Sequence, residues 1–188
     1  MKKQLSSFAI LLSLGLLLYN CDATAQPSNL VRPKVDASID VDPQTDVLKV
    51  KVYATGVQMY NFVLDEKTKK YVLDVSKSTP KAMLFDETGK QIGTHGKGPF
   101  WESSLDNSRV EGNPESIKKS SSPNSIPWLL LETKKQDKAG YGIFSNIAKI
   151  QRVETSGGVA PKDANVLYFP DKVVSVPYTA VYYFYTKK

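Results

Sequence analysis

The chain has 188 residues, of which 41% are hydrophobic, so it can bury a core of its own and fits a single domain. Its formal net charge of +6 comes mainly from lysines in small separate groups, without the dense basic run of a nucleic-acid-binding arm. One histidine and one cysteine in the whole chain leave too few ligands for an ordinary zinc site. We therefore expect no nucleic-acid partner, no bound metal and no cofactor.

Residues 1–25 are predicted to be a signal peptide. A basic head precedes an apolar run from Phe8 to Leu18, which is too short to span a bilayer comfortably. Ala23-Thr24-Ala25 then fits the small-residue cleavage pattern, which makes Gln26 the expected N-terminus. Later apolar runs are shorter than a membrane span, so no transmembrane segment is expected after the signal is removed. The expected location is secreted or periplasmic.

A lipid anchor at Cys21 is the alternative interpretation of the same stretch. Leu18 at the third position before this cysteine suits a lipoprotein cleavage site. Tyr19 and Asn20 do not, because the residues just before a lipidated cysteine are normally small. We favour release at Gln26, and both interpretations place the folded domain outside the cytoplasm.

The next segment, residues 26–45, is polar and proline-bearing and is predicted to be an N-terminal tether or an irregular edge. Residues 46–188 are predicted to form a single all-β domain. Hydrophobic residues alternate from Val47 to Ala54, as in a strand with one face in a core. The stretches 57–64 and 70–75 bracket a charged turn, which indicates a hairpin.

Two shorter hairpins are expected next along the chain. The first spans residues 82–93, with Gly89 supplying the positive φ angle of a tight turn. The second spans residues 100–110, with Asp106-Asn107 at its turn. A stretch rich in serine, lysine and proline follows, and residues 113–124 are therefore predicted to be a surface excursion.

Four strands are expected in the rest of the chain, at residues 126–133, 147–155, 165–169 and 173–186. The last is the longest, and alternate residues divide it into two faces, Tyr178, Ala180, Tyr182 and Phe184 on one and Thr179, Val181, Tyr183 and Tyr185 on the other. Both faces carry aromatic residues, so we expect this strand to be covered on both sides. No segment has a sustained helical spacing. The predicted fold class is all-β, an antiparallel β-sandwich or barrel-like fold with few short helices.

The densest group of functional residue types lies between Gly93 and Glu102. His95 stands among glycines, and Trp101 directly precedes the glutamate. An aromatic ring beside a carboxylate suits a sugar or a cation, and a histidine can act as a general base near neutral pH. We favour the structural interpretation, in which the glycines shape a loop, His95 braces that loop and Trp101 belongs to the core.

Arg152 is the second candidate, in a predicted strand before a pair of glycines. Its planar guanidinium could hold a carboxylate or a sulfate. The interpretation that we favour is an ion pair across the sheet with Glu102 or Glu154. Gln58 also lies in a predicted strand, and we expect the glycine-rich turn to bring the histidine and the tryptophan close to Gln58 and Arg152.

Six blocks of the chain resemble the DUF3455 family of exported or secreted proteins. They follow in order over nearly the whole predicted mature chain, as Tyr53–Tyr60, Ala82–Asp86, Gly93–Glu102, Ile126–Leu131, Ile150–Pro161 and Val176–Tyr185. The resemblance implies one all-β domain and no particular activity. Family members often carry two cysteines where this chain has Phe62 and Asn165, and an aspartate where it has Val181. A disulfide or a catalytic carboxylate at these places is therefore not expected here.

Three functions fit these observations. The one that we favour is a non-enzymatic module that binds a small molecule or an anionic or glycan envelope polymer, with candidate residues His95, Trp101, Glu102, Gln58 and Arg152. The alternatives are a polysaccharide hydrolase or lyase that uses His95 and Glu102, and a structural envelope or stress protein. A cleft with aromatic residues and one cation favours binding. Facing carboxylates favour an enzyme, and scattered positions favour a structural role.

Overall fold

The structure is a computed structural model, and it describes residues 30–120, 122, 124–134, 140–161 and 173–188. The predicted signal peptide, the lipid-anchor alternative at Cys21 and the predicted strand at residues 165–169 lie outside the described residues.

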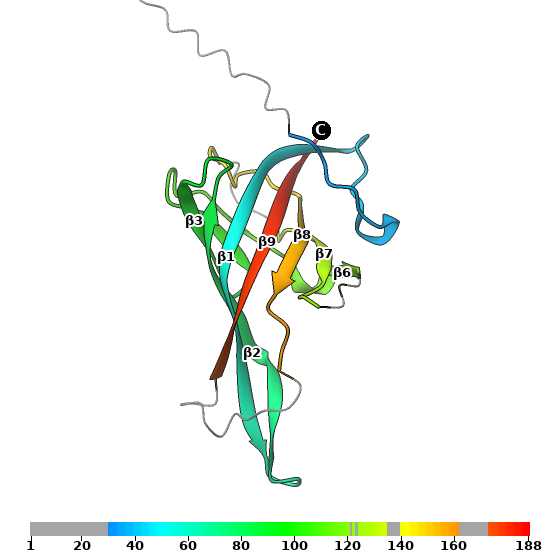
Figure 1. Ribbon diagram of the computed structural model, residues 1–188. Coiled ribbons are helices and arrows are strands. Elements are labelled where there is room, and N and C mark those ends of the chain that lie inside the picture. The colour runs from blue at the N-terminus through cyan, green and yellow to red at the C-terminus, as the bar shows by residue number, and fades with distance from the viewer. Residues whose placement is uncertain (1–29, 121, 123, 135–139, 162–172) are drawn as a thin grey trace, which may run out of the picture.

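Within the described residues, nine strands form one antiparallel sheet in the order β5-β4-β3-β2-β1-β9-β8-β7-β6 (Figure 1). Their bounds are β1 Asp46–Asp65, β2 Lys70–Phe85, β3 Gln91–Gly96, β4 Phe100–Ser103, β5 Arg109–Glu111, β6 Lys118–Ser120, β7 Trp128–Glu132, β8 Lys149–Gly157 and β9 Val173–Lys187. Two short 3-10 helices accompany them, η1 (Ala37–Ile39) and η2 (Pro114–Ser116). The prediction of an all-β fold is confirmed. The sheet is curled but not closed into a barrel.

The predicted hairpins are present. The turn between β1 and β2 places Lys69 at a φ of 53°, and the turn between β2 and β3 places Gly89 at 81°. The turn between β4 and β5 has Asn107 at 58°. Asparagine and glycine tolerate this left-handed region at low cost, so Gly89 and Asn107 mark their turns in the sequence. Two expected strands at 47–54 and 57–64 are one continuous strand, β1.

The central strand β9 is buried on both faces from Ala180 to Tyr185, as its sequence predicts, whereas Thr179 and two residues before it are exposed. Tyr178, Tyr182 and Phe184 belong to the larger core on the concave face of the sheet. Tyr183 and Tyr185 belong to a second core on the opposite face. Because successive side chains of a strand point to opposite sides, one strand supplies aromatic residues to two cores.

The segment before β1 covers part of the second core. Ile39 and Val41 are fully buried against the sheet. The buried Gln151 amide donates a hydrogen bond to the Ile39 carbonyl at 2.7 Å, and Ser120 bonds the Asp36 carboxylate. Residues 35–41 are therefore part of the folded body and do not hang from it as a tether.

The sheet curls so that its two outer parts meet at one end. Gly112, just after β5, pairs with Thr133, just after β7. The Asn113 N–H donates to the Glu132 carbonyl and the Lys134 N–H donates to the Glu111 carbonyl. This contact gives the sheet a concave face that is enclosed on several sides. The predicted surface excursion at 113–124 contains η2 and β6, which extend this wall.

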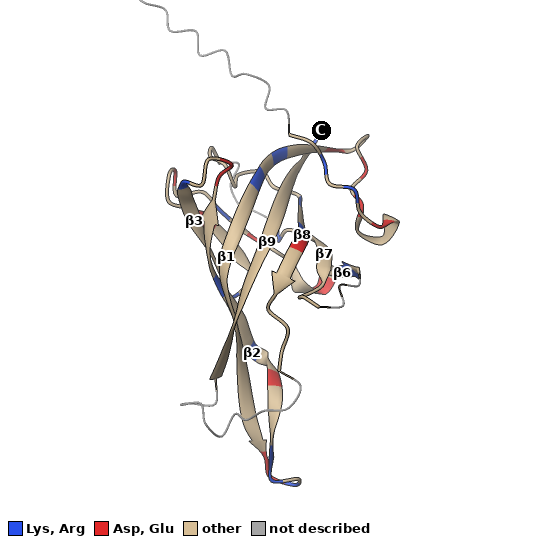
Figure 2. Cartoon of the chain, viewed as in Figure 1, with Lys and Arg blue, Asp and Glu red and all other residues tan. Residues whose placement is uncertain are grey.

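The far halves of β1 and β2 extend beyond the rest of the sheet as a two-stranded hairpin (Figure 1). Charged residues gather at its tip and in the loops of the body (Figure 2). Among the described residues, no helix is long and apolar enough to span a membrane.

We predict that Ile39→Ala lowers the free energy of unfolding by about 3 kcal/mol, because it leaves a cavity in the second core. Val31→Ala is the matched control, since Val31 is 78% exposed and its loss should change stability by less than about 0.5 kcal/mol. Urea unfolding of the two variants measures the difference. Equal stabilities would show that the segment before β1 does not pack on the sheet in solution.

Candidate functional site

A cavity of about 290 Å³ opens on the concave face of the sheet. Its walls are mostly apolar and come from eight strands and the loops beside them. The described residues that line it are Gln58, Tyr60, Pro80, His95, Pro99, Trp101, Ile117, Lys119, Ile126, Pro127, Leu129, Leu131, Arg152 and Tyr182. The structure therefore brings four of the five sequence candidates, His95, Trp101, Gln58 and Arg152, to one place.

Strand pairing explains how these residues meet. His95 in β3 lies opposite Trp101 in β4, and Arg152 in β8 lies opposite Tyr182 in β9. Directly paired residues of antiparallel strands place their side chains on the same face. Gln58 reaches the same face from β1. Two separate strand pairs, β3–β4 and β8–β9, thus both contribute to the wall of the cavity.

The aromatic rings form a packed cluster at one end. The rings of His95 and Trp101 stack with centroids 4.4 Å apart and an interplanar angle of 13°. The Tyr182 ring lies 5.3 Å from each of them in a tilted or edge-on orientation. Stacked and edge-on pairs of this kind add to the energy of burial, so this wall is rigid.

His95 is neutral in the folded protein. Its Nδ1 donates a hydrogen bond to the Phe100 carbonyl at 2.7 Å, which fixes the proton on Nδ1 and leaves Nε2 as an acceptor. Burial lowers the pKa of His95 from 6.5 to about 4; the hydrogen bond to Phe100 acts in the opposite direction, and the Arg152 charge adds to the lowering. The bond across the β3–β4 turn is the loop brace expected from the sequence.

The glycines near His95 shape the hairpin. Gly98 has a φ of 141°, a backbone conformation that other residues rarely adopt. A Cβ atom at Gly96 would lie 2.7 Å from the Phe100 ring. These glycines therefore serve the turn and the packing of an aromatic side chain.

Arg152 is half-buried and makes no ion pair with a carboxylate in the described part of the chain. Its Nε and Nη2 donate to the Pro127 carbonyl at 3.2 and 2.8 Å. The favoured prediction of an ion pair with Glu102 or Glu154 was wrong. Glu102 lies on the opposite face of the sheet, where it pairs with Arg109. Glu154 follows Arg152 by two residues at an irregularity of β8, where its φ is 49°.

Several buried donors in and beside the cavity lack partners. The Trp101 Nε1 and the hydroxyls of Tyr178 and Tyr182 make no hydrogen bond of normal geometry with a described residue. Each of these side chains is at most 3% exposed. Burial raises the pKa of both tyrosines, so their hydroxyls stay protonated and able to donate. Such groups are costly to bury unsatisfied, and their presence marks a place where a polar partner fits.

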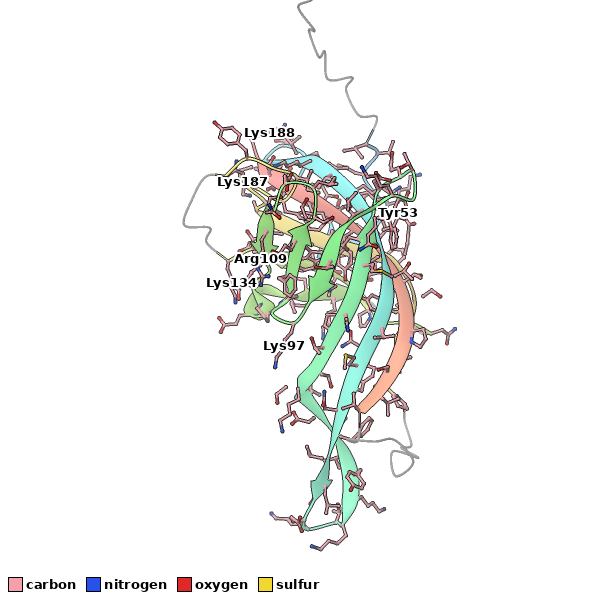
Figure 3. The ribbon with its side chains drawn as sticks, turned by 90° about the vertical axis from the view of Figure 1, so that its left-hand side faces the viewer. Tyr53, Lys97, Arg109, Lys134, Lys187 and Lys188 are labelled. Atoms are coloured by element: carbon pink, nitrogen blue, oxygen red, sulfur yellow. The ribbon has the colours of Figure 1, made fainter. Side chains whose placement is uncertain are left out.

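Glu102 does not belong to this group. It follows Trp101 in β4, so its side chain points to the opposite face of the sheet. There it pairs with Arg109 at 3.2 Å, and Arg109 in turn pairs with Glu111 at 3.0 Å. Lys134 also pairs with Glu111, and Figure 3 shows Arg109 and Lys134 near each other at this edge of the sheet.

Sequence analysis missed Tyr182, Tyr60 and Lys119 as cavity residues. Tyr182 was assigned only to an apolar face, although a buried tyrosine normally needs a partner for its hydroxyl. Tyr60 bonds the Gly158 carbonyl and closes the cavity from β1. Lys119 lies in the stretch predicted as an excursion, and nothing in its local sequence distinguishes it from other surface lysines.

No group of three or more histidine, cysteine, aspartate or glutamate side chains that could hold a metal ion occurs among the described residues. The cavity itself is lined by one histidine and by no carboxylate from the described part of the chain. Its chemistry is that of hydrogen-bond donors, aromatic rings and positive charge.

The family model for DUF3455, described as a protein of unknown function, matches residues 43–186. The chain belongs to this family, as its six blocks predict. Comparison with curated proteins and with solved structures gave no match.

We predict that stability falls as the pH drops from 6.5 to 4 because of His95. In this interval the unfolded chain binds a proton at this histidine and the folded protein does not, so protonation favours unfolding by about 2 to 3 kcal/mol at pH 4. Urea unfolding at a series of pH values measures the slope.

The control for this effect is His95→Asn, whose side-chain amide can still donate to the Phe100 carbonyl but does not titrate. This variant should lose the pH dependence between 6.5 and 5 whatever its overall stability. Below about pH 5, carboxylates with lowered pKa values such as Asp46 and Asp106 also lose stabilisation, but they do so equally in both proteins, so the difference between wild type and variant isolates His95. An unchanged slope in the variant would show that His95 is not a buried neutral group.

Proposed function

We propose that this protein is an exported, non-enzymatic binding module that holds a small organic molecule in the concave cavity. The observation that carries the proposal is the convergence of His95, Trp101, Gln58 and Arg152 on one cavity with buried donors that lack partners. Aromatic walls with few polar groups are typical of ligand sites.

The size of the cavity supports a small ligand. Apolar cavities of about 150 Å³ hold a benzene molecule, and ligand sites begin near about 300 Å³. At about 290 Å³, this cavity suits one aromatic ring with a short substituent. Because no described carboxylate lines it and most of its wall is apolar, a small molecule with an apolar body fits better than an extended glycan.

The arrangement gives less support to the enzymatic alternative. Hydrolysis of a glycoside normally uses two facing carboxylates, and Glu102 lies on the other face of the sheet from His95. With a pKa of about 4, His95 is also a weak base at neutral pH. Export is proposed from residues 1–25, whose pattern of basic head, apolar run and small residues is that of a signal peptide.

Cinnamyl alcohol is a suitable neutral probe, since it has one aromatic ring and a short polar chain. We predict that it binds the wild-type protein and that Leu129→Phe reduces the binding at least tenfold, because the larger ring occupies the cavity. Isothermal titration calorimetry or the intrinsic tryptophan fluorescence measures the affinity.

Leu130→Phe is the matched control, because Leu130 follows Leu129 in the same strand but packs in the second core on the opposite face. It should bind the probe as the wild type does, although overpacking costs it stability. Equal loss in both variants, or absence of binding of both this alcohol and the corresponding acid, cinnamate, to the wild type, would refute a binding role for this cavity.

A further inference from the structure

Arg152 has the environment of a ligand-binding arginine. A half-buried cation without a carboxylate neighbour is unfavourable unless something neutralises it, since burial removes part of its hydration. The Pro127 carbonyl accepts from Nε and Nη2, which holds the guanidinium plane in place. One further contact of the guanidinium is with the Tyr182 hydroxyl, and no described residue supplies a carboxylate for its remaining N–H groups.

The charges around the cavity have one sign. The positive charge of Arg152 acts on His95, Tyr60, Tyr178 and Tyr182, so its field reaches across the site. Lys119, an exposed residue that lines the cavity, adds a second positive charge. No described aspartate or glutamate opposes them. The cavity therefore attracts a negatively charged group.

The neutral polar groups of the cavity also favour a negatively charged ligand group. The Trp101 Nε1 is a donor without a partner among the described residues, and its side chain is 1% exposed. The equally buried Tyr182 hydroxyl lies between the side chains of Arg152 and Tyr178, and makes no hydrogen bond of normal geometry with a described residue. An indole N–H can only donate. A carboxylate accepts several hydrogen bonds at once, so it can satisfy donors that a hydroxyl or an amide would leave unpaired.

Other side chains of the cavity can pack against the apolar part of the ligand. The stacked His95–Trp101 pair and the side chains of Ile126 and Leu129 offer flat and aliphatic surfaces. A planar body can lie against such walls while its charged end turns to the guanidinium.

We propose that the ligand is a small aromatic or conjugated monocarboxylate, whose carboxylate is held by Arg152 and whose ring lies among the apolar walls. This inference rests on the proposed binding function and adds the ligand class. Arg152 acts as a fixed fork that accepts a planar anion, and the cavity limits the body to about one ring with a short chain.

Cinnamate and cinnamyl alcohol test the proposal, because they share a conjugated skeleton and differ in charge. The wild-type protein should bind cinnamate about tenfold or more tightly than the alcohol at neutral pH. Arg152→Met should abolish this preference by weakening cinnamate about tenfold and leaving the alcohol within about twofold. Unchanged alcohol binding shows at the same time that the variant keeps its cavity. Isothermal titration calorimetry gives all of these affinities.

Two further variants locate the effect. Arg109→Met removes an arginine from the opposite face of the sheet and should leave both affinities unchanged. Arg152→Lys keeps the charge but loses the planar fork, and it should recover only part of the preference.

The outcomes separate the two claims. If the alcohol binds and cinnamate binds no better, the carboxylate class is overturned and the binding function stands. If neither probe binds, both claims fail. If Lys119→Met removes the preference and Arg152→Met does not, the inferred role of Arg152 is wrong.

Discussion

The structure depends on β9, a long strand that is buried on both of its faces from Ala180 to Tyr185. Its backbone pairs with β1 on one side and β8 on the other, and its alternating aromatic side chains enter two cores. Burial of each large aromatic side chain contributes a few kcal/mol, so β9 stabilises both cores. The positions of Gln58, Tyr182 and Arg152 in the cavity follow from how β1 and β8 align with this strand.

Register links the central strand to the candidate site. Tyr182 pairs with Arg152 across the β8–β9 interface, so the guanidinium and the tyrosine ring reach the same face. A shift of one residue in either strand would send that strand's side chain to the opposite face and separate the two groups. The curl of the sheet then brings the His95–Trp101 pair to within 5.3 Å of the Tyr182 ring. A cavity with unpaired donors results from strands that are far apart in sequence.

Local signals predicted much of this fold. The turns at Gly89 and Asn107 and the two faces of the last strand were predicted because turn chemistry and the period of two are local properties. The packing of Ile39 and Val41 was not predicted, since the segment around them is polar and their contacts come from distant strands. The grouping of His95, Trp101, Gln58 and Arg152 was expected from a glycine-rich turn that returns the chain to the sheet.

The error at Glu102 and Arg152 has a physical cause. Opposite charges in one sequence suggest an ion pair, but only strand register and face decide whether two side chains meet. Neighbouring residues in a strand point to opposite faces, so Glu102 cannot share a cavity with Trp101. Because Glu102 is on the other face, Arg152 donates to the Pro127 carbonyl instead of a carboxylate. Its guanidinium can therefore still bind a negatively charged ligand.

A crystal structure of the protein soaked with cinnamate tests the central claim most directly. The carboxylate should lie within hydrogen-bond distance of the Arg152 guanidinium, with the ring between the His95–Trp101 pair and Leu129. A second hollow, of about 610 Å³, includes Thr55, Met83 and Phe100 in its lining and provides an internal comparison. Cinnamate bound only there, or with its carboxylate turned away from Arg152, would contradict the claim.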